Sequence, residues 1–284
     1  MILELPRGRQ LDLSSPVVMA VLNCTPDSFS DSGRHRDIEV AVAAAHRMLD
    51  EGAAILDIGG ESTRPGAEPV SAAEECDRVL PLIERLARER DCILSIDTMK
   101  PAVMLAACRA GAAIINDVCA LQAEGAMEAA VSTGAAVCLM HMQGEPGTMQ
   151  QAPHYASVVD EVSAFLASRV EACLAQGIPA GRLLIDPGFG FGKTLAHNLE
   201  LLAGLSSFNA LRLPMLVGMS RKGMLGQITG KPVSERVAAG AAAATIAVLN
   251  GARIIRTHDV AETVDAVKMA EAVRLAAQAA SAPS

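Results

Sequence analysis

The chain has 284 residues and is 51% apolar, which is enough to bury one large core. Its formal charge is −8, its Lys and Arg residues are scattered, and it has no Trp and one Tyr. Nucleic-acid binding is therefore not expected, because it calls for basic stripes and aromatic platforms. The sequence shows no signal peptide and no apolar run long enough to cross a bilayer.

Seven cysteines, an odd number without a C-x-x-C pair, read as reduced thiols of a cytoplasmic protein. No linker or shift in composition divides the chain. We expect a single cytoplasmic domain over residues 1–284 that does not bind a membrane, with a loose alanine-rich tail from about residue 275.

Eight short apolar runs follow one another along the chain, and each predicts a buried parallel strand. They span residues 17–22, 54–58, 93–96, 113–115, 137–140, 183–185, 214–219 and 252–255. The segments between them have helical apolar spacing, for example 40–49, 72–86 and 158–174.

Eight strands alternating with helices predict an α/β fold, a single (β/α)8 TIM barrel with its active site at the C-terminal ends of the strands. A doubly wound open sheet is the alternative, but that fold usually carries a glycine fingerprint after its first strand. Here the first strand leads into Asn23-Cys24-Thr25-Pro26-Asp27. Polar residues stop the eight runs, at Asn23, Asp57, Asp97, Asn116, His141, Asp186, Ser220 and Arg256.

Acidic and amide side chains stand at three of these strand ends: Asp97, Asn116 with Asp117, and Asp186. In a barrel they would meet at one mouth, where carboxylates and carboxamides can pair with the N–H and amino groups of a flat heterocycle. Taken singly, each Asp is more simply explained as a helix cap or as a side chain that hydrogen-bonds the backbone of a loop. Several on separate strands favour a binding site.

The loop after the sixth run reads Asp186-Pro187-Gly188-Phe189-Gly190-Phe191-Gly192-Lys193, and its glycines allow the backbone to approach a ligand closely. Ser220-Arg221-Lys222 follows the seventh run, and Arg256-Thr257-His258-Asp259 the eighth. Loops at these places often bind phosphate in barrels. A helix cap at Ser220 and a salt bridge at Arg256 are the structural alternatives.

Two long polar loops, 23–31 and 59–66, have the small residues of segments that close over a substrate. His141 lacks a second ligand at metal spacing, so we interpret it as a structural histidine. A nucleophile motif of the Gly-x-Ser-x-Gly type does not occur, which argues against covalent catalysis.

These strings together closely resemble bacterial dihydropteroate synthases, over about residues 10–270. The matching strings are Asn23 to Asp31, Gly59 to Gly66, Ser95 to Thr98, Ile114 to Asp117, Leu139 to Gln143, Asp186 to Lys193, Ser220 to Lys222 and Ile254 to Asp259.

The resemblance implies a cytoplasmic, commonly dimeric enzyme that joins 4-aminobenzoate to 6-hydroxymethyl-7,8-dihydropterin diphosphate in folate biosynthesis, by an SN1-like path. It implies Mg2+ as cofactor, Asp97, Lys222 and Arg256 as catalytic residues, and competition by sulfonamides. It places the pterin ring at Asp97, Asn116, Asp186 and Lys222, and the diphosphate at Arg256, His258 and Asn23, with Asn23 also contacting the metal. The aminobenzoate side is implied to be Phe29, Thr63, Arg64, Pro65, Phe191 and Ser220.

Two other functions remain open at the level of sequence. One is the pterin domain of a methyltetrahydrofolate-corrinoid methyltransferase, which would not need the Thr63-Arg64-Pro65 or Ser220-Arg221-Lys222 strings. The other is a catalytically silent pterin-binding paralogue. Cys24, Cys119 and Gly223 depart from the usual residues of the family; the last removes a hydroxyl near the aminobenzoate carboxylate.

Overall fold

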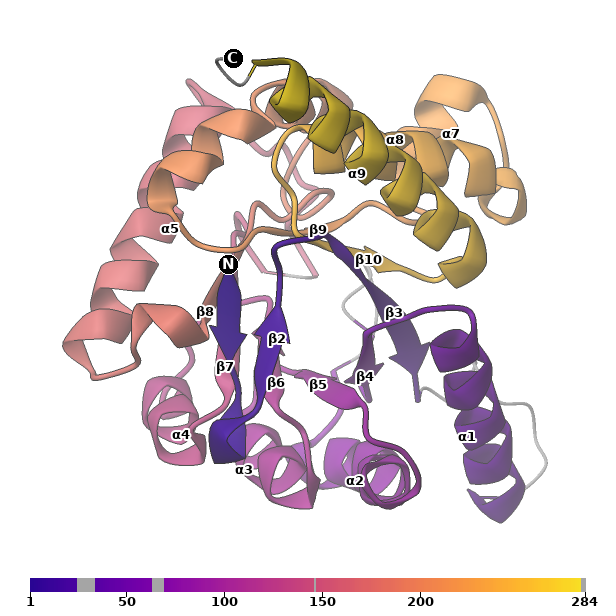
Figure 1. Ribbon diagram of the computed structural model, residues 1–284. Helices are drawn as coiled ribbons and strands as arrows, with labels where there is room; N and C mark the ends of the chain where they lie inside the picture. The colour runs from indigo at the N-terminus through magenta and orange to yellow at the C-terminus, as the bar shows by residue number, and fades with distance from the viewer. Residues whose placement is uncertain (25–33, 63–68, 146, 282–284) are drawn as a thin grey trace.

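The computed structural model describes residues 1–24, 34–62, 69–145 and 147–281. Eight parallel strands form one sheet, in the order β8-β7-β6-β5-β4-β3-β10-β9. A parallel bridge between Ile185 and Met215 joins its two edges and closes a barrel (Figure 1). The strands are β3 (Val17–Asn23), β4 (Ile55–Gly59), β5 (Ile93–Asp97), β6 (Ile114–Asp117), β7 (Ala136–Met140), β8 (Leu183–Asp186), β9 (Leu216–Gly218) and β10 (Ile254–Thr257).

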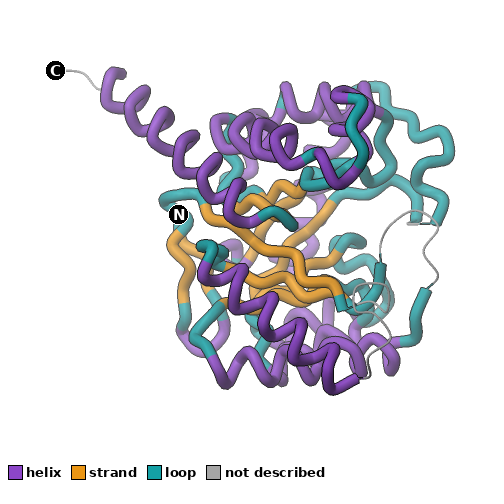
Figure 2. The backbone as a smooth tube through the Cα atoms, turned by 90° about the vertical axis from the view of Figure 1, so that its right-hand side faces the viewer, coloured by secondary structure: helices purple, strands orange, loops and turns teal. Residues whose placement is uncertain are grey.

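Helices lie around the strands, as the tube view shows most clearly (Figure 2). A helix follows each barrel strand along the chain, and α8 is an additional helix between α7 and β10. Short 3-10 turns lie at Ala180–Arg182, Leu205–Leu211 and Val233–Glu235. The helices are α1 (Arg34–Asp50), α2 (Ala72–Glu89), α3 (Pro101–Ala110), α4 (Ala126–Thr133), α5 (Val158–Ala175), α6 (Leu195–Ala203), α7 (Gly223–Thr229), α8 (Val237–Leu249) and α9 (Val260–Ser281).

An N-terminal hairpin closes the floor of the barrel. Strands β1 (Ile2–Glu4) and β2 (Gln10–Asp12) pair antiparallel through the turn Pro6–Gly8. The side chains of Leu3, Leu5 and Leu13 belong to the same buried cluster as the lower inward-facing residues of the strands. That cluster includes Met19, Ile55, Ile93, Ile114, Leu184, Leu216 and Ile254.

Strand alternation decides which residues reach the mouth of the barrel. In β4, Leu56 and Ile58 pack outward against the helices, whereas Ile55 faces the interior. Because side chains alternate along a strand, Asp57 and Gly59 also face the interior, nearer the mouth. The inward positions therefore change from apolar at the floor to polar at the mouth.

Side-chain caps fix where three helices begin. Ser71 accepts a hydrogen bond from the Glu74 amide at the start of α2, and Ser157 accepts one from Asp160 at the start of α5. Thr194 and His197 form a reciprocal capping box on α6. Such caps satisfy amides that the first turn of a helix leaves unpaired.

The predicted barrel is confirmed, and all eight strands occur where they were expected. The seventh is shorter than predicted: it begins at Leu216 rather than Pro214, since proline has no amide for the ladder. The alanine-rich end also differs from the expected loose tail, because α9 remains helical as far as Ser281. In the described residues, no helix is long and apolar enough to cross a membrane.

Candidate active site

Three strand ends meet in one ion-pair cluster at the mouth. The guanidinium of Arg256 on β10 places Nε 2.6 Å from Asp57 Oδ2 on β4 and Nη2 2.7 Å from Asp97 Oδ2 on β5. Asn116 on β6 donates to Asp57 Oδ2 at 3.0 Å. We call these four residues the carboxylate-arginine cluster. It brings together three residues that the sequence predicted for the site: Asp97, Asn116 and Arg256.

Asp57 is the member of the cluster that the predicted site omitted. Its side chain is fully buried, and its Oδ1 has no hydrogen-bond partner among the described residues. The available signal was its place among the polar strand stops, two residues beyond the inward-facing Ile55. What the sequence could not show is its pairing with Arg256, which lies 199 residues away.

The cluster holds two carboxylates against one guanidinium, with Asp57 fully buried and Asp97 and Arg256 partly exposed at the mouth. Burial raises the pKa of Asp97 to about 7, against the opposing pull of Arg256, and the nearby Asp57 charge adds to the rise. Burial also raises the pKa of Asp186. Groups with raised pKa values crowded in one cavity are a common property of reaction sites.

Asp186 and Lys222 approach the cluster from the other side of the mouth. Asp186 Oδ1 accepts a hydrogen bond of 2.7 Å from the Gly188 amide, which fixes the carboxylate at the start of the loop. Lys222 donates to the carbonyl of Phe189 at 2.6 Å. Its ammonium lies 4.0 Å from the ring centroid of Phe191, a cation–π contact. Burial lowers the pKa of Lys222 to about 8.

The two phenylalanines of that loop have different environments. Phe189 is 1% exposed and belongs to the core, whereas Phe191 is half-buried beneath Lys222. Gly190 between them has φ +77°, and an added Cβ would lie 2.9 Å from Lys222 Cδ. Glycine is thus required both by the backbone and by the close approach of the lysine chain.

Ser220 links the last two loops of the barrel instead of capping a helix. Helix α7 begins after Lys222 without a side-chain cap, so the helix-cap interpretation of Ser220 is wrong. Ser220 Oγ accepts from the His258 amide at 3.2 Å and lies 3.1 Å from His258 Nδ1. Arg221 and Asp259 form an ion pair of 2.6 Å beside it. These contacts hold the Ser220 and His258 loops together.

Asn23 stands at the end of β3, beside Gly59. A Cβ added to Gly59 would lie 3.7 Å from Asn23 Oδ1 and 3.8 Å from Asp97 Oδ2, so the glycine leaves space between these oxygens. Within the described residues, no group of three or more His, Cys, Asp or Glu could hold a metal ion. Oxygen ligands and an incomplete protein shell fit Mg2+, which usually takes its remaining ligands from phosphate and water.

Phe29, Thr63, Arg64 and Pro65 lie outside the described residues. The described ends of the second long loop are tied down by Glu61. Its Oε1 accepts from the Val70 amide at 3.0 Å, and its Oε2 pairs with Lys100 Nζ at 2.9 Å. Lys100 also pairs with the buried Glu75 at 2.6 Å.

His141 is buried among other side chains, with 6% of its surface exposed. Its Nδ1 lies 3.0 Å from Lys193 Nζ, and its ring meets Phe165 edge-on at a centroid distance of 5.0 Å. Burial, with the charge of Lys193 beside it, lowers the pKa of His141 to about 3. This environment agrees with the interpretation of His141 as a structural residue.

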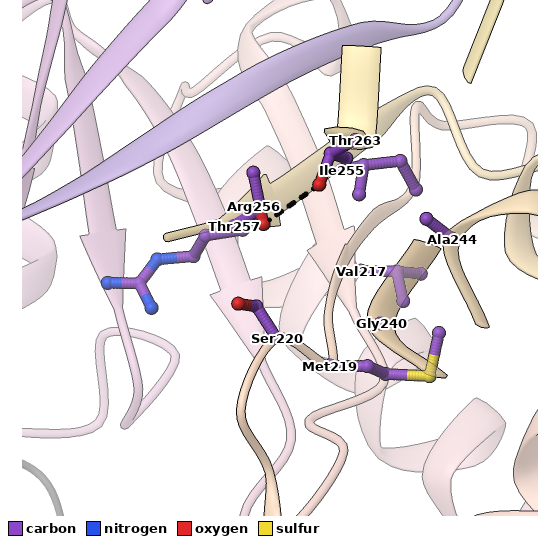
Figure 3. Close-up of a pocket in the computed structure, with 9 residues that line it drawn as sticks. All are labelled: Val217, Met219, Ser220, Gly240, Ala244, Ile255, Arg256, Thr257 and Thr263. Carbon is purple, nitrogen blue, oxygen red and sulfur yellow. Dashed lines mark hydrogen bonds between the residues drawn. The ribbon is translucent and has the colours of Figure 1, made fainter. Parts of the chain in front are cut away.

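A small pocket lies on the helix side of β9 and β10, not in the mouth (Figure 3). Val217, Ala244 and Met219 face it, whereas the Arg256 guanidinium points away from it. Thr257 and Thr263 close one wall with a hydrogen bond of 3.0 Å between their hydroxyls. Ser220 and Arg256 also line the pocket, so it adjoins the carboxylate-arginine cluster although the guanidinium points away from it.

The sequence matches the family of pterin binding enzymes over residues 19–258. It is 52% identical over 266 residues to a dihydropteroate synthase of Escherichia coli (strain K12), covering 94% of each chain. The chain belongs to the dihydropteroate synthase family. Membership of this family makes the protein an enzyme, a transferase, and agrees with the resemblance seen in the sequence.

Solved structures of the dihydropteroate synthase family have the same fold. That of the Yersinia pestis enzyme in a sulfonamide drug complex aligns with a TM-score of 0.92 and 53% identity, covering 97% of this chain and 100% of that chain. That of the Xanthomonas albilineans enzyme in complex with 7,8-dihydropteroate aligns with a TM-score of 0.86 and 47% identity, covering 97% and 98%.

Proposed function

We propose that this enzyme condenses 4-aminobenzoate with 6-hydroxymethyl-7,8-dihydropterin diphosphate to give 7,8-dihydropteroate and pyrophosphate, as its family membership indicates. The observation that carries the mechanism is the carboxylate-arginine cluster. It holds a permanent cation and two carboxylates at the mouth of the barrel, with Asp57 fully buried and Asp97 and Arg256 partly exposed. A substrate with an anionic diphosphate and an amino-bearing heterocycle needs both kinds of group.

The pterin ring is assigned to Asp97, Asn116, Asp186 and Lys222. The carboxylates accept from the ring N–H and amino groups, and the Asn116 amide supplies a donor and an acceptor. Lys222 donates to the ring oxygen or nitrogen from its position above Phe191. Asp57 supports this arrangement by holding both Asn116 and Arg256.

The diphosphate is assigned to Arg256, His258 and Asn23. Arg256 binds two carboxylates in the absence of substrate, so phosphate oxygens would compete with Asp97 for its Nη2. Release of Asp97 from Arg256 would free its Oδ2 for the pterin, whose N–H donors and developing positive charge would then favour the ionised carboxylate. Asn23 would hold Mg2+, and the bound ion would supply further positive charge near the leaving group.

Cleavage of the bond between the pterin methylene carbon and the diphosphate oxygen leaves a cation on the pterin and both bonding electrons on pyrophosphate. Asp97 stabilises that cation, while Arg256 stabilises the pyrophosphate. The amine nitrogen of 4-aminobenzoate then attacks the methylene carbon, and the proton that it loses passes to the released pyrophosphate or to water. This SN1-like order suits an arylamine, which is too weak a nucleophile to displace pyrophosphate directly.

The aminobenzoate side is assigned to Phe191 and Ser220, together with Phe29, Thr63, Arg64 and Pro65. Phe191 is half-buried and offers a ring face to an aromatic acid. Sulfonamides, which imitate the aromatic acid, would compete there. The sulfonamide complex of the Yersinia pestis relative supports this part of the proposal.

The enzyme is further proposed to act as a cytoplasmic homodimer. Its seven cysteines are free thiols, as expected in a reducing compartment. Helices α8 and α9 pack side by side and expose five apolar residues: Ile246, Leu249, Met269, Val273 and Leu275. A second copy of the chain could cover them. Met269→Lys should give a monomer by light scattering, whereas Val40→Lys on α1 should not change the mass.

Pyrophosphate release with Mg2+, the dihydropterin diphosphate and 4-aminobenzoate tests the activity, each component being omitted in turn. Dihydropteroate formed only in the complete mixture supports the proposal. Pterin binding without product would instead indicate a silent paralogue, and absence of pterin binding would refute the assigned site.

A further inference from the structure

We propose that Lys193, with His141 as its neutral partner, is a positioning residue for the aminobenzoate site. It would act by holding residues 187–192, which we call the glycine loop, in the shape that supports Phe191 and Lys222. The inference rests on the proposed function, because the reaction supplies its readout.

The amine of Lys193 lies inside the loop that it terminates. Its side chain is 3% exposed, and it donates to the carbonyls of Gly188 at 2.9 Å and Phe191 at 3.1 Å. The third contact is His141 Nδ1 at 3.0 Å. The His141 carbonyl lies 3.4 Å away as a longer fourth contact, and none of the four acceptors is a carboxylate. Burial lowers the pKa of Lys193 to about 7, and the charge of Asp186 offsets this only in part. Keeping an ammonium buried in this way is costly, which argues for a specific role.

Each successive carbonyl of the loop from Gly188 to Gly192 accepts a side-chain hydrogen bond. Besides the two that Lys193 satisfies, Phe189 accepts from Lys222 at 2.6 Å. Gly190 accepts from Gln150 at 2.6 Å, and Gly192 accepts from the Tyr155 hydroxyl at 2.8 Å. Lys193 is the donor that binds two of these carbonyls and so holds the loop closed on itself.

The backbone of the loop leaves little freedom for any other shape. Gly188 has φ +71°, and an added Cβ would lie 1.9 Å from the His141 carbonyl oxygen. Gly192 has φ +60°, and an added Cβ would lie 2.3 Å from the Gln143 carbonyl oxygen. The loop therefore presses against the end of β7, and His141 supplies both a wall and an acceptor there.

Two residues assigned to the substrates depend on this loop. The Phe191 carbonyl is bound by Lys193, and its ring lies 4.0 Å from Lys222 Nζ. Lys222 in turn is anchored on the carbonyl of Phe189. If the loop opened, the ring and the ammonium would lose their common position even though neither had been altered.

The test measures KM and kcat separately in the Lys193→Met variant and compares each with the parent. Removal of the donor should raise the KM for 4-aminobenzoate at least fivefold and change kcat less than threefold. The exposed Lys231→Met is the matched control and should keep the parent KM. A purely structural role would reduce the amount of folded enzyme, seen by circular dichroism and melting, without changing KM.

A double-mutant cycle asks whether Lys193 acts through Phe191. In a Phe191→Leu background, Lys193→Met should raise KM less than twofold further, because the ring it positions is gone. The inference would be overturned if Lys193→Met raised KM by the same factor in both backgrounds. It would also be overturned if folded Lys193→Met kept the parent KM. If Lys193→Met does not fold, Lys193→Gln retains an N–H donor and should show an intermediate KM, and a parental KM there would also overturn it.

Dihydropteroate formation by the parent enzyme is measured first, which distinguishes failure of the proposed function from failure of the proposed role of Lys193. If the parent forms no dihydropteroate, the proposed function is wrong. If the parent forms it and the variants keep the parent KM, only the role of Lys193 is wrong.

Discussion

The floor and the mouth of the barrel are built from the same strands, two to four residues apart, yet their chemistry is opposite. At the floor, Leu3 and Leu13 of the N-terminal segment pack on Met19, Ile55 and their neighbours, all buried and apolar. At the mouth, inward positions carry Asp57, Asp97 and Arg256 in ion pairs.

The apolar floor and the charged mouth are expected to contribute differently to stability and to catalysis. Burial of apolar area stabilises the fold by about 25 cal/mol per Å2. Burial of ions instead carries a desolvation cost of a size similar to the gain from their mutual attraction. The mouth is therefore expected to contribute little to stability and nearly all of the catalysis, and the floor the reverse.

Asp97→Asn should give the largest change in activity. It removes the negative charge assigned to the pterin cation, so turnover should fall by about 100-fold or more, the usual size for a lost charge-stabilising group. The melting temperature should change little, since Arg256 retains Asp57. The measurement is kcat with both substrates saturating.

The matched control for that change is Asp91→Asn, an exposed carboxylate that pairs with Arg9. It should leave kcat unaltered. Turnover of Asp97→Asn within about twofold of the parent would remove Asp97 from the proposed role.

Leu13→Ala should show the opposite pattern at the floor. Truncation of this fully buried side chain should lower the free energy of unfolding by about 3 kcal/mol through lost burial and a new cavity. Below the melting temperature, kcat and both KM values should stay within twofold of the parent. Denaturant melts test the first part, with exposed Leu174→Ala on α5 as the control.

Asp57→Asn should lower kcat/KM by about 30-fold, since a hydrogen bond to a charged group contributes about 2 kcal/mol. Asparagine keeps the shape and an acceptor, but Arg256 loses one of its two anionic partners. Steady-state kinetics check the value. An unchanged kcat/KM would mean that Asp97 alone suffices to orient the guanidinium.

Lys222→Ala should weaken pterin binding by about tenfold, corresponding to about 1.4 kcal/mol for a lost charged donor. The dissociation constant of a pterin, measured by calorimetry, reports it directly. The exposed Lys268→Ala is its control. An unchanged constant would refute the placement of Lys222 at the pterin.

The smallest effect concerns pH. Burial lowers the pKa of Lys193 to about 7, below its unfolded value, so the unfolded chain binds more protons above pH 7. This lysine therefore makes stability rise as pH increases between about 7 and 10, by about 1.4 kcal/mol per pH unit at most. From pH 7 to 8.5 the free energy of unfolding of the parent should increase relative to that of Lys193→Met. A constant difference between them would contradict the lowered pKa.

Sequence by itself determined the barrel, because apolar runs that alternate with helical spacing leave few ways to bury both faces of a parallel sheet. It also determined that Asp97, Asn116, Asp186 and Arg256 lie at one mouth, because parallel strands end at the same edge. Those assignments needed only the succession of apolar runs along the chain and their periodicity, both of which can be read from the sequence.

Tertiary structure decided which of these groups touch. Asp57 meets Arg256, and Lys193 meets His141, only because barrel closure and a glycine loop bring distant segments to hydrogen-bond distance. Ser220 likewise binds the His258 loop rather than its own helix. Periodicity fixes the side of a strand on which a residue lies, whereas its partner depends on how all eight strands pack.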